Sequence, residues 1–254
     1  MDSTKLKIFL CSYAYRDKRI IDTVIDAIDL ADNANQIGIS VAIQDSYQYE
    51  INLSKDIYKK NIHYYPWQDR MGFAIHRNSI IQSIDNDAYI LFINPGTKFI
   101  KSWDTELKKI INNQVISLKE NIFSFNGTFI KKEDLDKIYY PIYLKLLGEE
   151  EDISIKLYSE NISIVSGIET IIEPGKNKSW DYIPFSENHM YNETVKLYKN
   201  GKNNFCSINN SFIDYSTKYP IKTIFYQTDD PLYTNQMIAL ENSIDRFLHY
   251  KNKI

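Results

Sequence analysis

Glycine and proline are both scarce in this sequence. It has 254 residues, of which 8 are Gly and 7 are Pro. Together they reach roughly half of the usual share of these two residues, which excludes collagen-like, linker and low-complexity proteins. Neither Gly-x-Gly-x-x-Gly nor Gly-x-x-x-x-Gly-Lys-Ser/Thr occurs. The sequence therefore lacks the two common glycine-rich loops that bind phosphate groups.

Cysteine and long apolar runs are scarce as well. Cys11 and Cys206 are the two cysteines, so a disulfide framework is excluded, and no Cys-x-x-Cys pair is present for zinc. This usage fits a reducing compartment, and we expect a cytoplasmic protein of a bacterium or a phage-infected cell. The first residues do not resemble a signal peptide. No apolar run is long enough for a membrane-spanning helix, so none is expected.

What remains is the composition of an ordinary globular protein that is rich in aromatic residues. Hydrophobic residues make up 43% of the chain and charged residues 25%, and there are 20 Tyr and 12 Phe. The net charge of -3 shows that the chain has no overall excess of positive charge of the kind that favours binding to nucleic acid.

The first half of the chain alternates apolar strands with amphipathic helices. Strands are predicted at residues 7–13, 37–43, 62–67 and 88–93. Helices are predicted between them, at residues 20–31, 73–84 and 103–111. This order is typical of an open α/β sheet, in which the almost wholly apolar strand 88–93 lies in the centre.

The second half is less regular. Asn126 and Gly127 favour a hairpin turn within residues 122–131. A helix is predicted at residues 149–160, a short strand at 162–165 and a C-terminal helix at 231–250. No linker and no internal repeat occur, so we expect one domain.

Four segments together resemble a known family. The sequences IFLCSYAYRD (residues 8–17), GFAIHR (72–77), YILFINPGTKFIKSWD (89–104) and GEEEDISIKLYSENISIV (148–165) resemble segments of the polypeptide (hydroxyproline-type) N-acetylglucosaminyltransferases, in the same order. The resemblance implies an α/β fold of the GT-A (Rossmann-like) glycosyltransferase type, with a mixed central sheet flanked by helices. Residues 1–118 would form the nucleotide-sugar half, 119–175 the acceptor half and 176–254 an irregular extension.

The resemblance also implies an activity. Such a protein transfers a hexose or N-acetylhexosamine from a UDP-sugar donor to an acceptor hydroxyl and retains the anomeric configuration. The acceptor would be a protein, a glycan or a modified base of phage DNA, hydroxymethylated or already glucosylated. The last alternative suits the AT-rich residue usage, and the lysines at 108–109, 131–132 and 199–202 could contribute a basic channel.

One position departs from the family. The acidic metal motif, which would bind Mn²⁺ or Mg²⁺ at the diphosphate, falls on Asn94, Pro95 and Gly96. Three interpretations stay open: an enzyme without a metal, a metal site rebuilt from other acids such as Glu173, or a degenerate domain that only binds. The literal Asp-x-Asp at residues 85–87 precedes the central strand, and we interpret it as a solvated turn.

Candidate nucleotide-binding residues follow the predicted strands, because ligands of open α/β sheets bind at the carboxyl ends of the strands. By resemblance, Tyr15 would stack near the nucleobase, and Arg16 or Asp17 would bind the base or the ribose. Asp17 is alternatively a helix cap. Gln44, with Asp45 beside it, would line the nucleotide edge or form a plain strand-end turn.

Two cations are candidates for binding the diphosphate. Arg77 would form a bidentate clamp, or would be a surface residue of an amphipathic helix. Lys98 follows the degenerate motif and could replace the charge of a metal, and Asn94 and Gly96 would contact the donor beside it. His76 is a further donor or a structural histidine.

Carboxylates open the predicted helix at residues 149–160. By resemblance, Glu149 and Glu150 would bind sugar hydroxyls or orient the acceptor hydroxyl. The alternative is that they only complement the helix dipole. Trp103 and Asp104 are predicted to be structural, and His189 is a candidate ligand from the C-terminal part.

Overall fold

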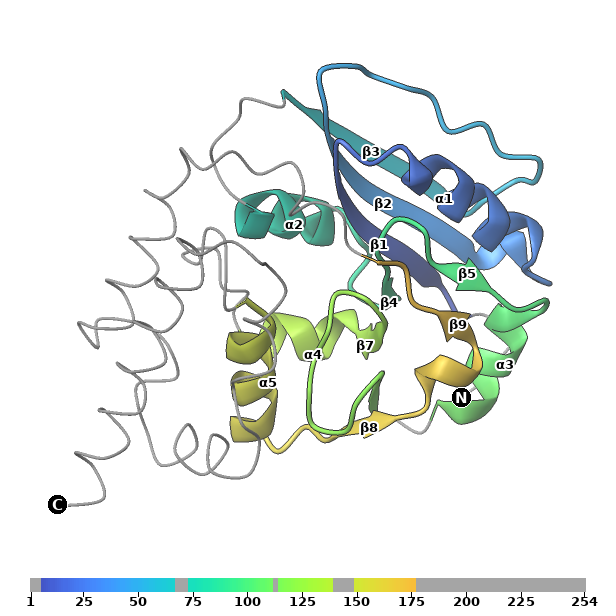
Figure 1. Cartoon of the computed structure of the whole chain (residues 1–254). Coiled ribbons are helices and arrows are strands. Elements are labelled where there is room, and N and C mark those ends of the chain that lie inside the picture. Colours follow the sequence, from blue (N-terminus) through green and yellow to red (C-terminus); the bar gives the residue numbers. More distant parts are fainter. Residues whose placement is uncertain (1–5, 67–72, 112–113, 139–148, 177–254) are drawn as a thin grey trace, which may run out of the picture.

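The computed structural model describes residues 6–66, 73–111, 114–138 and 149–176, and these form a layered α/β structure (Figure 1). A seven-stranded sheet forms the middle layer, with the strand order β3-β2-β1-β4-β7-β6-β8. The strands are β1 (Ile8–Tyr15), β2 (Ile37–Gln44), β3 (Lys59–Tyr65), β4 (Tyr89–Phe92), β6 (Val115–Ser117), β7 (Thr128–Lys131) and β8 (Ile164–Ser166).

The sheet is mixed. Strands β1, β2, β3 and β4 run parallel, whereas β7 runs antiparallel to both of its neighbours, β4 and β6. Strand β8 pairs parallel with β6. The carboxyl ends of β1, β2 and β4 therefore share one edge, which we call the carboxyl edge, and their other ends form the amino edge.

Helices cover both faces of the sheet (Figure 1). One face packs on α1 (Arg19–Asp29) and α3 (Trp103–Ile110), and the other on α2 (Phe73–Gln82), α4 (Lys132–Lys137) and α5 (Glu149–Ser159). Side chains of β1 alternate between the two cores, as the pleat of a strand requires. Leu10 lies in the core under α1, and its neighbours Phe9 and Cys11 lie in the core under α2 and α5.

The structure confirms the predicted α/β order of the first half. Helix α1 forms because Ile20, Val24 and Ile28 recur at helical spacing and bury one stripe against the sheet. Strand β3 begins three residues earlier than predicted, at Lys59, and the predicted last residue, Trp67, lies outside the described residues. The predicted C-terminal helix at residues 231–250 also lies outside them.

The predicted hairpin at residues 122–131 is wrong. Only β7 is a strand there, and it pairs with β4 and β6. The preceding Phe123 and Phe125 instead form an edge-to-face aromatic cluster with Phe92. Their backbone N–H groups donate to side chains of α5, to Ser154 Oγ at 2.8 Å and to Glu150 Oε1 at 2.6 Å. Tertiary contacts therefore replace the predicted first strand of the hairpin, while residues 125 and 126 still form a turn.

Several short elements had no sequence signal. Strands β5 (Lys98–Phe99) and β9 (Ile172–Glu173) form a small antiparallel sheet of their own. The other elements that were not predicted are β6, α4 and two 3-10 helices, Ala34–Gln36 and Ile168–Thr170.

Trp103 and Asp104 are structural, as predicted. The Trp103 indole N–H donates to the carbonyl of Ala27 at 2.7 Å in the core. The buried Asp104 carboxylate accepts the backbone N–H groups of Asp32 at 2.8 Å and Asn33 at 3.1 Å. One side chain of α3 thereby fixes the loop between α1 and β2.

Replacing Asp104 tests this role. We expect Asp104→Ala to lower the free energy of unfolding by about 3 kcal/mol, because two backbone donors of the loop lose a charged acceptor. Urea unfolding measures the loss. Asp104→Asn keeps one acceptor oxygen and should lose less, so equal losses for both variants would contradict the account.

Candidate functional site

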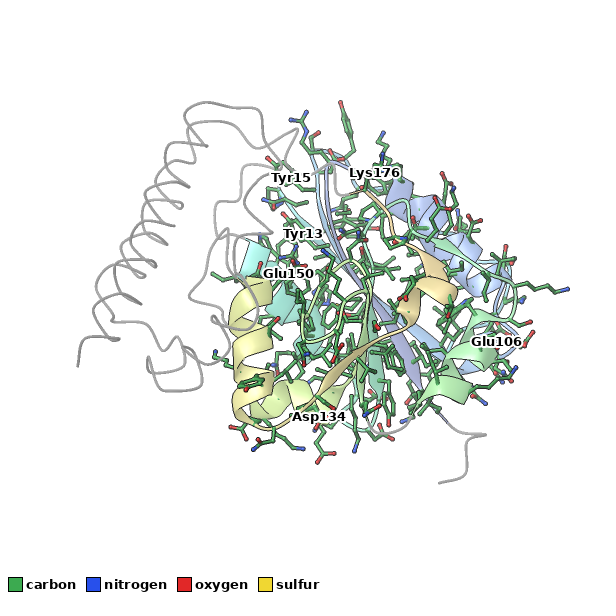
Figure 2. All side chains as sticks on the ribbon, turned by 60° about the horizontal axis from the view of Figure 1, so that its bottom comes forward. Tyr13, Tyr15, Glu106, Asp134, Glu150 and Lys176 are labelled. Carbon is green, nitrogen blue, oxygen red and sulfur yellow. The ribbon has the colours of Figure 1, made fainter. Side chains whose placement is uncertain are left out.

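The carboxyl edge gathers three segments that are far apart in the sequence. They are the loop after β1, the turn after β4, and the chain that leaves β9. Figure 2 shows Tyr15 and Lys176 towards one end of the molecule and Asp134 at the opposite end. This is the edge at which open α/β sheets bind their ligands.

The turn after β4 carries the degenerate motif. The backbone N–H of Thr97 donates to the Asn94 carbonyl at 3.1 Å, and the Thr97 hydroxyl donates to the same oxygen at 2.8 Å. Gly96 has a φ of 89°, which glycine adopts without strain, and its N–H donates to Thr23 Oγ1 of α1 at 2.7 Å. The turn is thus fixed both internally and against α1.

Gly175 packs directly on this turn. Its N–H donates to Thr97 Oγ1 at 3.1 Å. A Cβ atom at Gly175 would lie 2.5 Å from the Pro95 carbonyl oxygen and 2.6 Å from the Thr97 nitrogen. Only glycine allows so close an approach between the two backbones.

Asp17 and Arg19 connect the loop after β1 to the other two segments. Arg19 donates from Nε to Asp17 Oδ1 at 2.9 Å and from Nη2 to Oδ2 at 2.6 Å, which is a bidentate ion pair. Arg19 Nη2 also donates to the carbonyl of Lys176 at 2.8 Å. Asp17 is only 5% exposed and accepts the Arg19 backbone N–H at 3.2 Å, but the N-cap residue of α1 is Lys18, one residue later than the cap interpretation placed it.

Sequence reasoning missed Arg19. Its guanidinium lies against Gly96, because a Cβ atom on that glycine would be 2.7 Å from Arg19 Nη1. The local sequence signal is limited to an Asp and an Arg two residues apart at a helix start. The contacts to Gly96 and Lys176 are visible only in the fold.

The residues at this turn do not fit a divalent cation. Asn94 is a neutral amide, and the guanidinium of Arg19 covers Gly96. Glu173, the carboxylate considered as a replacement ligand, pairs with Lys98 at 3.0 Å on the small sheet. No group of three or more His, Cys, Asp or Glu residues suited to a metal occurs within the described ranges.

The literal Asp-x-Asp motif lies at the amino edge, away from this turn. Asp85 accepts a hydrogen bond from the Tyr58 hydroxyl at 2.6 Å, and Lys7 pairs with Asp85 at 3.3 Å and with Asp87 at 3.2 Å. These contacts support the interpretation of residues 85–87 as a turn. Its two aspartates are paired with Lys7, so they do not only contact solvent.

The residues predicted to bind the nucleotide differ in their exposure to solvent. Strand β1 extends two residues beyond the prediction, so Tyr15 alternates into the core and is 3% exposed. Arg16 is exposed, in a left-handed conformation with φ of 51°, and its N–H donates to the Gln44 carbonyl at 2.9 Å. Lys98 is exposed on β5 in its pair with Glu173.

Gln44 belongs to a buried polar cluster beside α2. Its Oε1 accepts the hydroxyl of Tyr13, and its Nε2 donates to the Pro66 carbonyl at 3.2 Å. The His76 ring stacks on Tyr13 and lies 3.9 Å from the centroid of Tyr65. These contacts support structural roles for Gln44 and His76.

Arg77 and Glu149 form a buried ion pair between α2 and α5. Arg77 Nη1 donates to Glu149 Oε2, and the two side chains are 11% and 4% exposed. The guanidinium carbon lies 4.1 Å from the centroid of the Phe125 ring and 5.5 Å from that of Tyr13. Arg77 therefore fixes the first residue of α5.

Glu150 has a different environment from Glu149. Its Oε1 accepts the Phe125 N–H at 2.6 Å and the Ser124 hydroxyl at 3.1 Å. The surrounding protein removes water from the carboxylate, and this desolvation raises its pKa, although the Phe125 N–H and nearby Arg77 act in the opposite direction. Two adjacent carboxylates thus differ: one is held in an ion pair, and the other has a raised pKa.

The basic stretches considered for DNA binding do not lie at the carboxyl edge. Lys132 follows β7, where its N–H donates to the Ala88 carbonyl at the amino edge, and its amine pairs with Asp136. Lys108 donates to Gln36 just before β2, and Lys109 pairs with Glu106. The lysines at 199–202 and the candidate ligand His189 lie outside the described residues.

Among the described helices, none has the length and apolar character that crossing a bilayer requires. A scan against protein-family models and a search of curated proteins found no match.

Solved structures do match. TarS of S. aureus has 13% identity and a TM-score of 0.54, and the match covers 94% of this chain and 49% of TarS. TarS 1–349 in complex with UDP-GlcNAc has 11% identity and a TM-score of 0.54, with 94% and 81% covered. The mannosyltransferase PcManGT from Pyrobaculum calidifontis, in complex with GDP-Man and Mn²⁺, has 10% identity and a TM-score of 0.52, with 94% and 70% covered.

These similarities confirm the predicted GT-A glycosyltransferase fold with its mixed central sheet. The chain spans about half the length of the longer TarS chain. At such low identity the likeness shows the fold alone, and the resemblance to the hydroxyproline-type family stays a prediction.

A double-mutant cycle tests the buried pair of Arg77 and Glu149. We expect Arg77→Met and Glu149→Gln each to lower the free energy of unfolding by about 3–5 kcal/mol, because each leaves one buried charge without its partner. The double variant should lose clearly less than the sum. Additive losses, measured by denaturant unfolding, would show that the pair is not coupled.

The pH dependence of stability tests the environment of Glu150. The pKa of Glu150 is higher in the folded state than in the unfolded state, where it is about 4.3. The contribution of Glu150 to the free energy of unfolding is therefore most favourable below the unfolded pKa and is lost as the pH rises through the folded pKa. Glu150→Gln does not titrate. The variant should therefore gain stability relative to the natural protein as the pH rises above about 4, in thermal unfolding. A difference that does not change with pH would contradict the raised pKa.

Proposed function

We propose that this protein is a glycosyltransferase that moves a hexose or N-acetylhexosamine from a UDP-sugar to an acceptor hydroxyl. The observation that carries the proposal is the convergence, at the carboxyl edge of a GT-A fold, of the loop after β1, the turn after β4 and the chain after β9. TarS 1–349 holds UDP-GlcNAc and PcManGT holds GDP-Man in structures with the same fold, which supports a nucleotide-sugar donor here.

In this proposal the donor lies across the three segments. The nucleoside contacts Arg16 after β1, and the diphosphate lies at the turn that carries Asn94 and Gly96. Asp17, which is buried and paired with Arg19, positions the loop. The exposed, left-handed Arg16 supports this placement, because such backbone conformations in a loop cluster at binding sites. Tyr15, Gln44 and Arg77 support the site from within the fold, and their burial favours positioning roles over direct contact.

The two carboxylates of α5 then have separate tasks. Glu150 is the group we propose to orient the acceptor hydroxyl, by accepting a hydrogen bond from it while the departing diphosphate takes up the proton of the hydroxyl. Glu149 is a positioning residue that fixes the start of α5 through Arg77. We propose that transfer retains the anomeric configuration, which NMR of the product would report.

No step in this mechanism passes through a metal. Mn²⁺ accompanies GDP-Man in PcManGT, but the turn with Asn94 and Gly96 has no acidic ligand, and no described acid replaces it. We therefore favour the metal-free alternative over a rebuilt cation site.

The same neutral turn supports a second candidate, a degenerate domain that binds a sugar nucleotide without transferring the sugar. The acceptor stays open between a protein, a glycan and modified DNA. The described lysine stretches do not favour DNA, because they pair with acids or Gln36 and lie at the amino edge. We keep the division into a donor half, residues 1–118, and an acceptor half, residues 119–175, as part of the proposal.

Donor binding and turnover test the proposal together. We expect isothermal titration to detect UDP, and we expect UDP-sugar to be hydrolysed slowly in the absence of an acceptor. Glu150→Gln should lower turnover about 10²-fold with little change in UDP affinity, because the acceptor hydroxyl loses the carboxylate that orients it. The exposed Glu160 just beyond α5 offers the matched control, and Glu160→Gln should leave both values unchanged.

The outcomes separate the two candidates. UDP binding without turnover above background would support the binding module. No binding of UDP or of any UDP-sugar would contradict both.

A further inference from the structure

The degenerate turn and Arg19 form one structural feature. Gly96 is left-handed, with φ of 89°, and its missing Cβ leaves the space in which Arg19 Nη1 lies. Any side chain at this position would require Arg19 to move from its place against the turn. The glycine and the observed position of the arginine therefore depend on each other.

The guanidinium is fixed before any ligand arrives. Asp17, which is almost fully buried, holds it by two hydrogen bonds of 2.9 and 2.6 Å, and the Lys176 carbonyl accepts a third of 2.8 Å. The side chain is nevertheless 33% exposed. A planar guanidinium held in this way loses little further entropy when it binds a phosphate group.

We propose that Arg19 binds the diphosphate of the sugar nucleotide and takes the place that a divalent cation would otherwise have. The inference rests on the proposed donor site. Because Asp17 offsets the charge of Arg19, the arginine acts through directed N–H donors and not through net charge. Lysine cannot form the two parallel hydrogen bonds to Asp17. Arg19→Lys should therefore bind UDP more weakly than the natural protein, although it keeps the positive charge.

The first measurement uses the natural protein. Isothermal titration with UDP is carried out once with EDTA and once with Mn²⁺. We expect the same affinity in both. Binding that requires Mn²⁺ would overturn the role of Arg19 and leave the proposed transferase function standing. No binding under either condition would overturn the proposed function itself.

The second measurement compares UDP with uridine, which lacks the phosphates, in ligand-observed NMR and titration. We expect Arg19→Lys to weaken UDP binding at least about tenfold and to leave uridine binding unchanged. Lys109→Ala removes a cation that pairs with Glu106 on α3, and it should change neither affinity. Equal weakening of uridine and UDP would show a purely structural role and overturn the proposal, as would an unchanged affinity for UDP.

Discussion

The bidentate ion pair between Asp17 and Arg19 is the interaction on which the arrangement of the carboxyl edge depends. It lies at the end of β1, contacts the turn after β4 at Gly96, and reaches the chain after β9 through the carbonyl of Lys176. Since Asp17 is buried, its charge needs a partner, and Arg19 is that partner. One polar contact thereby positions three segments, and the remaining candidate residues are placed relative to them.

A second buried pair organises the other side of the site. Arg77 and Glu149 join α2 to α5, while the next residue, Glu150, accepts two hydrogen bonds from the loop of Phe125 and has a raised pKa. Neighbouring carboxylates with different environments are typical of sites in which one carboxylate is structural and the other titrates. In the proposal the first pair binds the donor, and the second pair fixes the start of α5, where Glu150 orients the acceptor.

Sequence periodicity predicted the layered fold but only part of the site. The spacing of Ile20, Val24 and Ile28 is local, so α1 could be predicted from it. The burial of Tyr15 could not be predicted, because β1 continues for two residues beyond the predicted end and this turns the Tyr15 ring into the core. Arg19 could not be found, because its contacts with Gly96 and Lys176 join residues far apart in the sequence. The hairpin before Gly127 was predicted wrongly for a similar reason: contacts between residues distant in sequence decide the structure there. The backbone N–H groups of Phe123 and Phe125 donate to side chains of α5 instead of to a neighbouring strand.

The central claim is that a nucleotide diphosphate binds at the turn after β4 through a guanidinium instead of a metal. A crystal structure of the protein with UDP, grown with a chelator present, tests it most directly. The account predicts diphosphate oxygens within hydrogen-bond distance of Arg19, beside Gly96. A diphosphate bound elsewhere, or UDP seen only when a cation held by carboxylates is supplied, would contradict it.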